Sequence, residues 1–275
     1  MSKWIVIISL ALFSLNCRQA NGKELTRISM DSIADTVGFR ANGSLRLLAT
    51  RGFEFTISDG SKTQKVVGKG FDKKDIIKCK FSANCERIVA ITGPIRNLLF
   101  TSPLNISYKY HLSAPQGDRE TVVVFTDSLL QLDISQCQSV RNLLCREYQL
   151  TELDVTHNPD LEQLDCSENR LRTLDMSQNR NLQVLFCSKN QLKDIDVIHN
   201  QKLRELVCFD NENLSLDVSA NRNLEFLSCD GLLQELDVTN NIELRTLICR
   251  CKLTALDFSQ NKKLRKLLIS DNNFS

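Results

Sequence analysis

Seven copies of one line of sequence occupy the second half of this 275-residue chain. An aspartate marks the same position in every copy, and successive aspartates are separated by four steps of 21 residues and then by two of 20. They are Asp133, Asp154, Asp175, Asp196, Asp217, Asp237 and Asp257. One copy is too short to bury its own leucines, so consecutive copies must stack around a shared core. The repeat therefore restricts the chain to an elongated, stacked architecture.

Each copy contains two similar halves, L-x-x-L-D-V-S-x-N and L-x-x-L-x-C-S-x-N. Leucines three and then two residues apart do not fit the period of a helix, whereas L-x-V and L-x-C alternate as a strand does. We therefore expect two short strands in each coil, and parallel, in-register pairing between coils about 4.8 Å apart. The predicted fold class is mainly β: a solenoid preceded by a small antiparallel β domain.

The second half-repeat resembles the leucine-rich repeat. Residues Leu182-Gln-Val-Leu-Phe-Cys-Ser-Lys-Asn190-Gln-Leu192 spell L-x-x-L-x-C-x-x-N-x-L. The D-[VIMF]-[ST]-x-N half looks like the nested 21-residue repeats of bacterial, often Bacteroidetes-type, leucine-rich repeat proteins. The match covers Leu129 to Ser275. This resemblance implies a curved scaffold that is commonly exported, binds other macromolecules, and has neither catalytic residues nor a cofactor.

The polar residues of the repeat predict satisfied turns. Asparagine can turn the chain and pair the backbone groups that a bend leaves free, so the asparagines that end the half-coils are expected to be structural. Each aspartate is expected to accept backbone N–H groups at a tight turn, aided by the hydroxyl two residues on. Calcium is the alternative for D-x-[ST]-x-N, but the glycine and the distal glutamate of a calcium loop are missing.

One cysteine recurs at the same position in six consecutive copies: Cys145, Cys166, Cys187, Cys208, Cys229 and Cys249. A zinc site gathers its ligands around one point, whereas this row supplies one thiol per coil. Neighbouring in-register strands also hold such side chains about 4.8 Å apart, wider than the spacing of about 3.8 Å between the Cβ atoms of a disulfide. We therefore predict small buried hydrophobes and no metal site. Cys79 and Cys85 are the only pair considered for a disulfide.

We expect three parts in the whole chain: a signal peptide over residues 1–22, a small β domain over 23–93 and a solenoid over 94–275, with regular repeats in 129–275. Short strands are expected at residues 25–30, 45–49, 53–58, 64–67, 76–81 and 87–92. Asn42-Gly43 and Asp59-Gly60-Ser61 are hairpin signals between such runs. Ile95-Arg-Asn-Leu98-Leu-Phe100 already resembles L-x-x-L-x-C, so divergent coils are expected from residue 94 onward.

The N-terminus has the order of a secretory signal: Lys3, then the apolar run Trp4 to Phe13, then polar residues. That run is shorter than the roughly 20 residues that span a bilayer. Two processing sites fit: Ala20-Asn21-Gly22 suits signal peptidase, and Ser14-Leu15-Asn16-Cys17 is a loose lipoprotein box with Cys17 as the lipidated residue. Both place the protein outside the cytoplasm, at the cell surface, in the periplasm or secreted, with an outer-membrane lipoprotein as one form.

Composition and motifs favour binding over catalysis. Lys and Arg number 35 against 33 Asp and Glu, so the chain lacks the basic surplus that is typical of nucleic-acid-binding proteins. His111, His157 and His199 lie in no hydrolase, zincin or phosphate-loop motif, so we predict that the chain is not an enzyme. The predicted function is binding of another macromolecule, a protein first and a glycan second. A structural or adhesin-like surface component is the alternative, and a lipid anchor is the only membrane contact expected.

The predicted binding surface is the outward face of the strands. In L-x-x-L-x-C the leucine and cysteine point inward, so the residues beside them point outward and line up across coils. Large apolar side chains recur there in the middle copies, and exposed apolar patches commonly mark interaction sites. The candidate ligand-binding residues are Phe186, Val207, Phe209, Phe226, Ile248 and Arg250.

The two processing sites can be separated by one substitution. If Cys17 is acylated, Cys17→Ala should release the protein from membranes and abolish labelling with a lipid precursor. Membrane fractionation and N-terminal sequencing provide the measurement. A mature N-terminus at Lys23, with fractionation unchanged by the substitution, would refute the lipoprotein interpretation in favour of signal peptidase.

Overall fold

The computed structural model describes strands at 36–49, 54–58, 63–67, 77–83, 89–92, 97–101 and 121–125, followed by residues 128–212, 215–231 and 233–273. Side chains are described at 64–67 and, with the same gaps, from residue 132 to 273. These residues contain fifteen strands and no helix, so no helix among them could cross a membrane. The signal peptide, Cys17, Cys85, the side chain of Cys79 and the expected strand at 25–30 lie outside the described residues.

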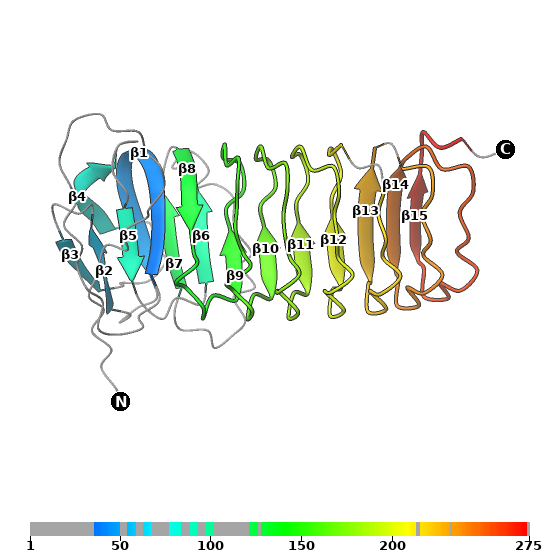
Figure 1. Ribbon diagram of the computed structural model, residues 1–275, viewed down its shortest axis with the longest axis horizontal. Helices are drawn as coiled ribbons and strands as arrows, with labels where there is room; N and C mark the ends of the chain where they lie inside the picture. The colour runs from blue at the N-terminus through cyan, green and yellow to red at the C-terminus, as the bar shows by residue number, and fades with distance from the viewer. Residues whose placement is uncertain are drawn as a thin grey trace.

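The repeats form a parallel solenoid whose coils follow one another along the long axis of the molecule (Figure 1). Each coil contributes one strand, and neighbouring strands pair in register, so that Leu164 lies between Leu143 and Leu185. The strands are β9 (Asn142–Leu144), β10 (Gln163–Asp165), β11 (Val184–Phe186), β12 (Glu205–Val207), β13 (Phe226–Asp230), β14 (Thr246–Arg250) and β15 (Lys266–Ile269). The predicted leucine-rich solenoid is confirmed.

Two strands occur in the first copy, whose first half-repeat contains β8 (Ser128–Asp133), but β8 pairs antiparallel with β1 (Thr36–Ala49) and not with the next coil. The expectation of two strands per coil is wrong for the later copies, whose first half-repeats contain a single isolated parallel bridge, Asp194 to Ser215. A turn begins two residues after the aspartate of each first half-repeat, and it leaves too few consecutive extended residues to pair with the next coil. The period-two alternation is therefore present in both halves, but only the second half continues long enough to form a ladder.

An antiparallel arrangement precedes the regular coils. The long strand β1 (Thr36–Ala49) pairs antiparallel with four strands: β4 (Ile77–Ala83), β5 (Val89–Thr92), β7 (Thr121–Phe125) and β8 (Ser128–Asp133). The strands β2 (Glu54–Ser58) and β3 (Thr63–Val67) form the hairpin predicted at Asp59-Gly60-Ser61, with Ser58 opposite Thr63. The strand β6 (Asn97–Thr101) is parallel to both β7 and β9 and joins this region to the ladder.

The predicted hairpin at Asn42-Gly43 is wrong. Both residues lie inside β1, which continues through them and shows register shifts on either side, between Arg40 and Ala41 and between Ser44 and Arg46. A glycine in a strand often marks a bulge, which bends the strand without reversing it. The expected strand at 45–49 is therefore the second part of a 14-residue strand.

The solenoid core consists of the leucines and cysteines of the repeat. The cysteines of the row, Cys145 to Cys249, are at most 1% exposed, which confirms the predicted burial. Burial raises the pKa of Cys166 and Cys187 well above the ordinary thiol value, so these side chains stay neutral and pack as small hydrophobes. The narrow interior between the strand and the returning half-coil suits this small side chain.

Asparagine side chains hold the turns of successive coils together, as predicted. The amide nitrogen of Asn221 donates to the carbonyls of Val197 and Asn200 in the preceding coil, at 3.0 and 2.9 Å. The same two bonds recur at Asn158, Asn179, Asn200, Asn241 and Asn261. In a second row each asparagine accepts the backbone N–H of the leucine that begins its own copy and donates to carbonyls of its own and the preceding copy; the row contains Asn169, Asn190, Asn211 and Asn272.

Asn221→Ala should destabilise the solenoid, because it removes two buried hydrogen bonds that tie this coil to the carbonyls of Val197 and Asn200 in the preceding coil. We expect a loss of about 2 to 5 kcal/mol in the free energy of unfolding, measured by urea denaturation. Asn223→Ala is the matched control, since Asn223 lies in the same coil but makes one exposed bond, to the carbonyl of Gln201 at 3.0 Å. Equal losses for the two variants would contradict the structural role of the buried row.

Candidate functional site

The outward face of the strand ladder consists of three parallel columns of side chains. The central column lies between the inward leucines and cysteines and contains Leu144, Asp165, Phe186, Val207, Ser228, Ile248 and Leu268. Its five apolar members, Leu144, Phe186, Val207, Ile248 and Leu268, are called the apolar stripe below. The first four are half-buried, and Leu268 is 48% exposed. The stripe is continuous at Phe186 and Val207, which are register partners.

The structure distributes the six predicted binding residues over all three columns. Phe186, Val207 and Ile248 belong to the apolar stripe. Phe226 lies in the column before the leucines, between Glu205 and Thr246. Phe209 and Arg250 belong to the third column, two residues beyond the stripe.

The three phenylalanines therefore lie in three different columns, and none has another as its register partner. The register therefore gives no direct pairing between these phenylalanine side chains. The strand alternation places Ser188 and Ser228 on the same face, but both residues are buried.

Asp165 interrupts the central column, and the sequence analysis did not select it. It lies between Leu144 and Phe186 in the register, and its carboxylate accepts the Ser167 N–H at 3.1 Å. Burial raises the pKa of this carboxyl group. The signal that could have identified it is its place in the central column, which is otherwise apolar apart from Ser228.

Ion pairs border the stripe on both sides. On one side Glu225 accepts a bond of 2.9 Å from Arg204 Nε and lies 3.3 Å from Arg245 Nε, and these contacts lower its pKa. On the other side Glu168 accepts bonds from Arg146 at 2.8 Å and from Lys189 at 3.1 Å. An apolar centre with a charged border is the arrangement found in many protein interfaces.

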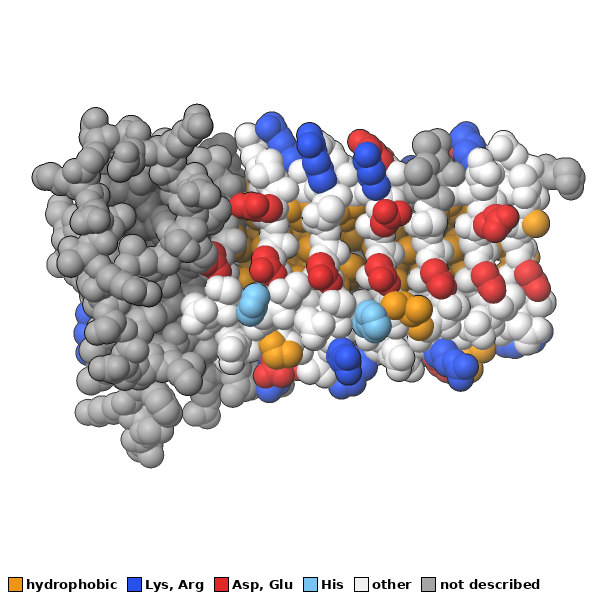
Figure 2. Space-filling model, in the orientation of Figure 1, with side chains coloured by type: hydrophobic (Ala, Val, Ile, Leu, Met, Phe, Trp, Pro, Cys, Tyr) orange, Lys and Arg blue, Asp and Glu red, His pale blue; other side chains and the backbone are white. Residues whose placement is uncertain are grey.

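The opposite side of the coils carries the aspartate column. Figure 2 shows a row of acidic side chains running along the stacked coils. In all seven coils one carboxylate oxygen accepts the N–H of the residue two positions later, for example Ser219 N–H to Asp217 at 2.8 Å. The hydroxyls of Thr156 and Thr239 donate to the same oxygens at 2.7 Å. The predicted turn role is confirmed, and it uses the Oδ1 atom of each aspartate.

The histidines of the repeat lie on turns beside this column. The Nδ1 atom of His157 is 3.6 Å from a carboxylate oxygen of Asp154, and both side chains are more than half exposed. His199 is likewise exposed. The hydroxyl of Thr156 lies 3.2 Å from the same nitrogen of His157, and it also donates to Asp154 at 2.7 Å as part of the turn. His111 lies outside the described residues.

The cysteine row contains one feature that sequence reasoning missed. Cys251, which the row does not include, is fully buried and points toward Cys249 and Cys229. The description of one thiol per coil is therefore wrong for this coil. The signal was the unusual C-x-C at Cys249-Arg250-Cys251, where the other coils have a polar or glycine residue at the last position.

Three solved structures with similar folds are internalins of Listeria monocytogenes. The functional domain of InlJ, described as including a cysteine ladder, is 28% identical over 52% of this chain and 42% of its own, with a TM-score of 0.38. Internalin C2 is 19% identical over 51% and 66%, and InlF is 15% identical over 52% and 45%, both with TM-scores of 0.46. The alignments span less than two thirds of each of these chains.

No protein-family model matches this sequence, and a comparison with curated proteins finds no match. A Bacteroidetes-like origin stays a prediction.

The aspartate turns should make stability depend on pH. Hydrogen bonds from the hydroxyl and backbone N–H of Ser219 lower the pKa of Asp217 below the ordinary 3.8, and Thr239 acts in the same way on Asp237. Because the native pKa is depressed, this stabilisation is present above pH 4 and is lost as the pH falls through the native pKa values. Urea unfolding at several pH values should show this loss in the native protein.

The substitutions Asp217→Asn and Asp237→Asn keep an oxygen acceptor but remove the titration. We expect the double variant to be less stable at pH 7 and to lose less stability on acidification to pH 3. Asp160→Asn is the control, because Asp160 is exposed and lies outside the column. An acid-induced loss that is identical in the native protein and the double variant would rule out this account.

Proposed function

We propose that the strand face of the solenoid binds a protein partner through the apolar stripe. The observation that carries this proposal is a set of partly exposed Leu, Phe, Val and Ile side chains in one column of the strand ladder, bordered by ion pairs. An exposed strand face without a partner favours polar side chains, because apolar area in contact with water costs about 25 cal/mol per Å². Binding would remove that cost.

The dimensions of the stripe suit a protein partner. Seven strands at about 4.8 Å extend for about 29 Å, a length comparable with one side of an ordinary protein interface. The strands are held by parallel register and by the buried asparagines, so the face loses little conformational entropy on binding. Charged borders such as Arg204–Glu225–Arg245 would then select the orientation of the partner.

The proposed role is recognition rather than catalysis, outside the cytoplasm. The Thr156 hydroxyl beside His157 donates to Asp154 within a local turn, and one carboxylate oxygen of each aspartate in the column is used by its turn in the same way. Export rests on the N-terminal sequence from Lys3 to Gly22, and the lipid anchor on Cys17. The divisions at residues 22 and 93 also stay proposals.

The binding surface can be located by crosslinking. A photoreactive amino acid placed at Phe186 should capture one saturable protein from the cell envelope, whereas the same group at Ile198 should not. Ile198 is the control because it is apolar and 44% exposed but belongs to the turn after the aspartate column. Capture at position 198 alone, or of glycan alone, would contradict the proposed surface or partner class.

Substitution of the stripe should then weaken binding of the captured partner. We expect Phe186→Ser, Val207→Ser and Ile248→Ser together to cost at least about 2 kcal/mol of binding free energy, measured by calorimetry. The control variant combines Ile198→Ser with Ile242→Ser, whose side chains are 44% and 53% exposed. Thermal unfolding of both variants tests whether the fold is retained. Unchanged affinity in a folded stripe variant would remove this face from consideration.

A further inference from the structure

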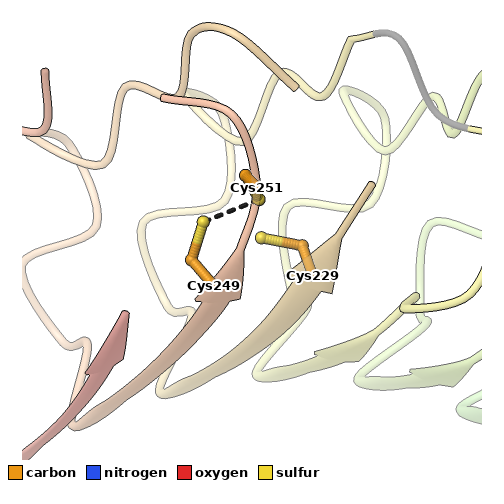
Figure 3. Close-up of side chains that lie close together, drawn as sticks. All are labelled: Cys229, Cys249 and Cys251. Atoms are coloured by element: carbon orange, nitrogen blue, oxygen red, sulfur yellow. Dashed lines mark hydrogen bonds between the residues drawn. The ribbon is translucent and has the colours of Figure 1, made fainter. Parts of the chain in front are cut away.

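Three buried thiols converge between the fifth and sixth coils. The sulfur atoms of Cys229, Cys249 and Cys251 all lie within 4.8 Å of one another, and those of Cys249 and Cys251 are 2.7 Å apart. Figure 3 shows that the three side chains come from two neighbouring coils and point into the space between them. Cys229 and Cys249 are register partners on β13 and β14, and Cys251 follows the end of β14. At most 1% of each residue is exposed.

The repeat departs from its own pattern at this point. In five coils the residue at the position of Cys251 is charged, exposed or partly exposed, and held at positive φ: Glu147, Glu168, Lys189, Asp210 and Asp271. Cys251 has no positive φ and turns inward instead. The next residue, an asparagine of the second row in four of these coils, is here Lys252. Two changes in one coil thus exchange a standard turn for a third thiol in the core.

We propose that Cys229, Cys249 and Cys251 form a three-sulfur site for a soft monovalent metal ion, Cu(I). Thiolate ligands select soft metals, and three sulfurs around one point provide trigonal coordination. With metal–sulfur bonds of about 2.3 Å, three such sulfurs lie about 4 Å from one another. The present spacing is compatible with that triangle once the sulfurs of Cys249 and Cys251 separate by rotation about their side-chain bonds.

The same donor set is poorly suited to zinc. Zinc sites in proteins are almost always tetrahedral, so a fourth ligand or an open position is required. Among the described residues, no histidine or carboxylate joins the three thiols, and the sulfurs are shielded from solvent.

Metal ions bind cysteine as the thiolate. The incoming ion takes the place of thiol protons, which pass to solvent. The flanking residues Arg250 and Lys252 are exposed, so the site lies one residue below the surface.

The test is a titration of the full-length, reduced protein with Cu(I) under nitrogen, in competition with a chromogenic Cu(I) chelator. We expect one ion per chain that resists the chelator, with a copper–thiolate absorption band in the ultraviolet. Cys251→Ala should lower the affinity by at least about tenfold, because it removes one of the three ligands. Cys187→Ala is the matched control, since Cys187 is equally buried in the same row but has no such cluster.

Folding and metal binding are measured separately. One equivalent of Cu(I) should raise the Tm of the native protein and of Cys187→Ala but not that of Cys251→Ala, and circular dichroism should confirm that each variant is folded. Equal Cu(I) affinity in the two variants would overturn the proposal, as would tighter binding of Zn²⁺. Mass spectrometry of the protein isolated without reductant gives a further decisive result, because a Cys249–Cys251 disulfide in place of free thiols would overturn it too.

Discussion

The structure depends on hydrogen bonds from buried asparagines to the carbonyls of the preceding coil. Every coil must change direction, and each bend leaves polar backbone groups in a region that water does not reach. One amide group, such as that of Asn200, donates hydrogen bonds to the carbonyl oxygens of Met176 and Asn179 in the coil before. Each coil therefore completes its neighbour, and an isolated coil would lose both this pairing and its apolar core.

This use of asparagine explains why the two halves of the coil differ. In the second half the backbone groups pair with the next coil as a parallel ladder, so Leu206 lies between Leu185 and Leu227. In the first half the aspartate turn and the asparagine provide the hydrogen bonds, and a continuous strand is not needed. The result is a solenoid with one regular sheet face and one face made of stacked turns.

The two faces offer different chemistry to a partner. On the turn face the carboxylates of Asp217 and Asp237 already accept local hydrogen bonds, so their charge is partly used within the fold. On the strand face Phe186, Val207 and Ile248 make no such contacts and leave apolar area partly exposed. The recognition surface is therefore inferred where the fold leaves interactions incomplete, and the thiol cluster at Cys251 where the repeat gives up its usual turn.

The sequence alone determined the solenoid, its register and the burial of the row from Cys145 to Cys249, because an exact repeat forces equivalent residues into equivalent places. It could not determine that the first half-repeats of the later copies lack a strand, or that β1 runs through Asn42-Gly43. Pairing partners distant in sequence decide both features. The tertiary structure also decided which outward residues share a column and that Cys251 turns inward to meet Cys229 and Cys249. Such contacts depend on the backbone path of one coil, and a departure from the repeat leaves that path unspecified by its neighbours.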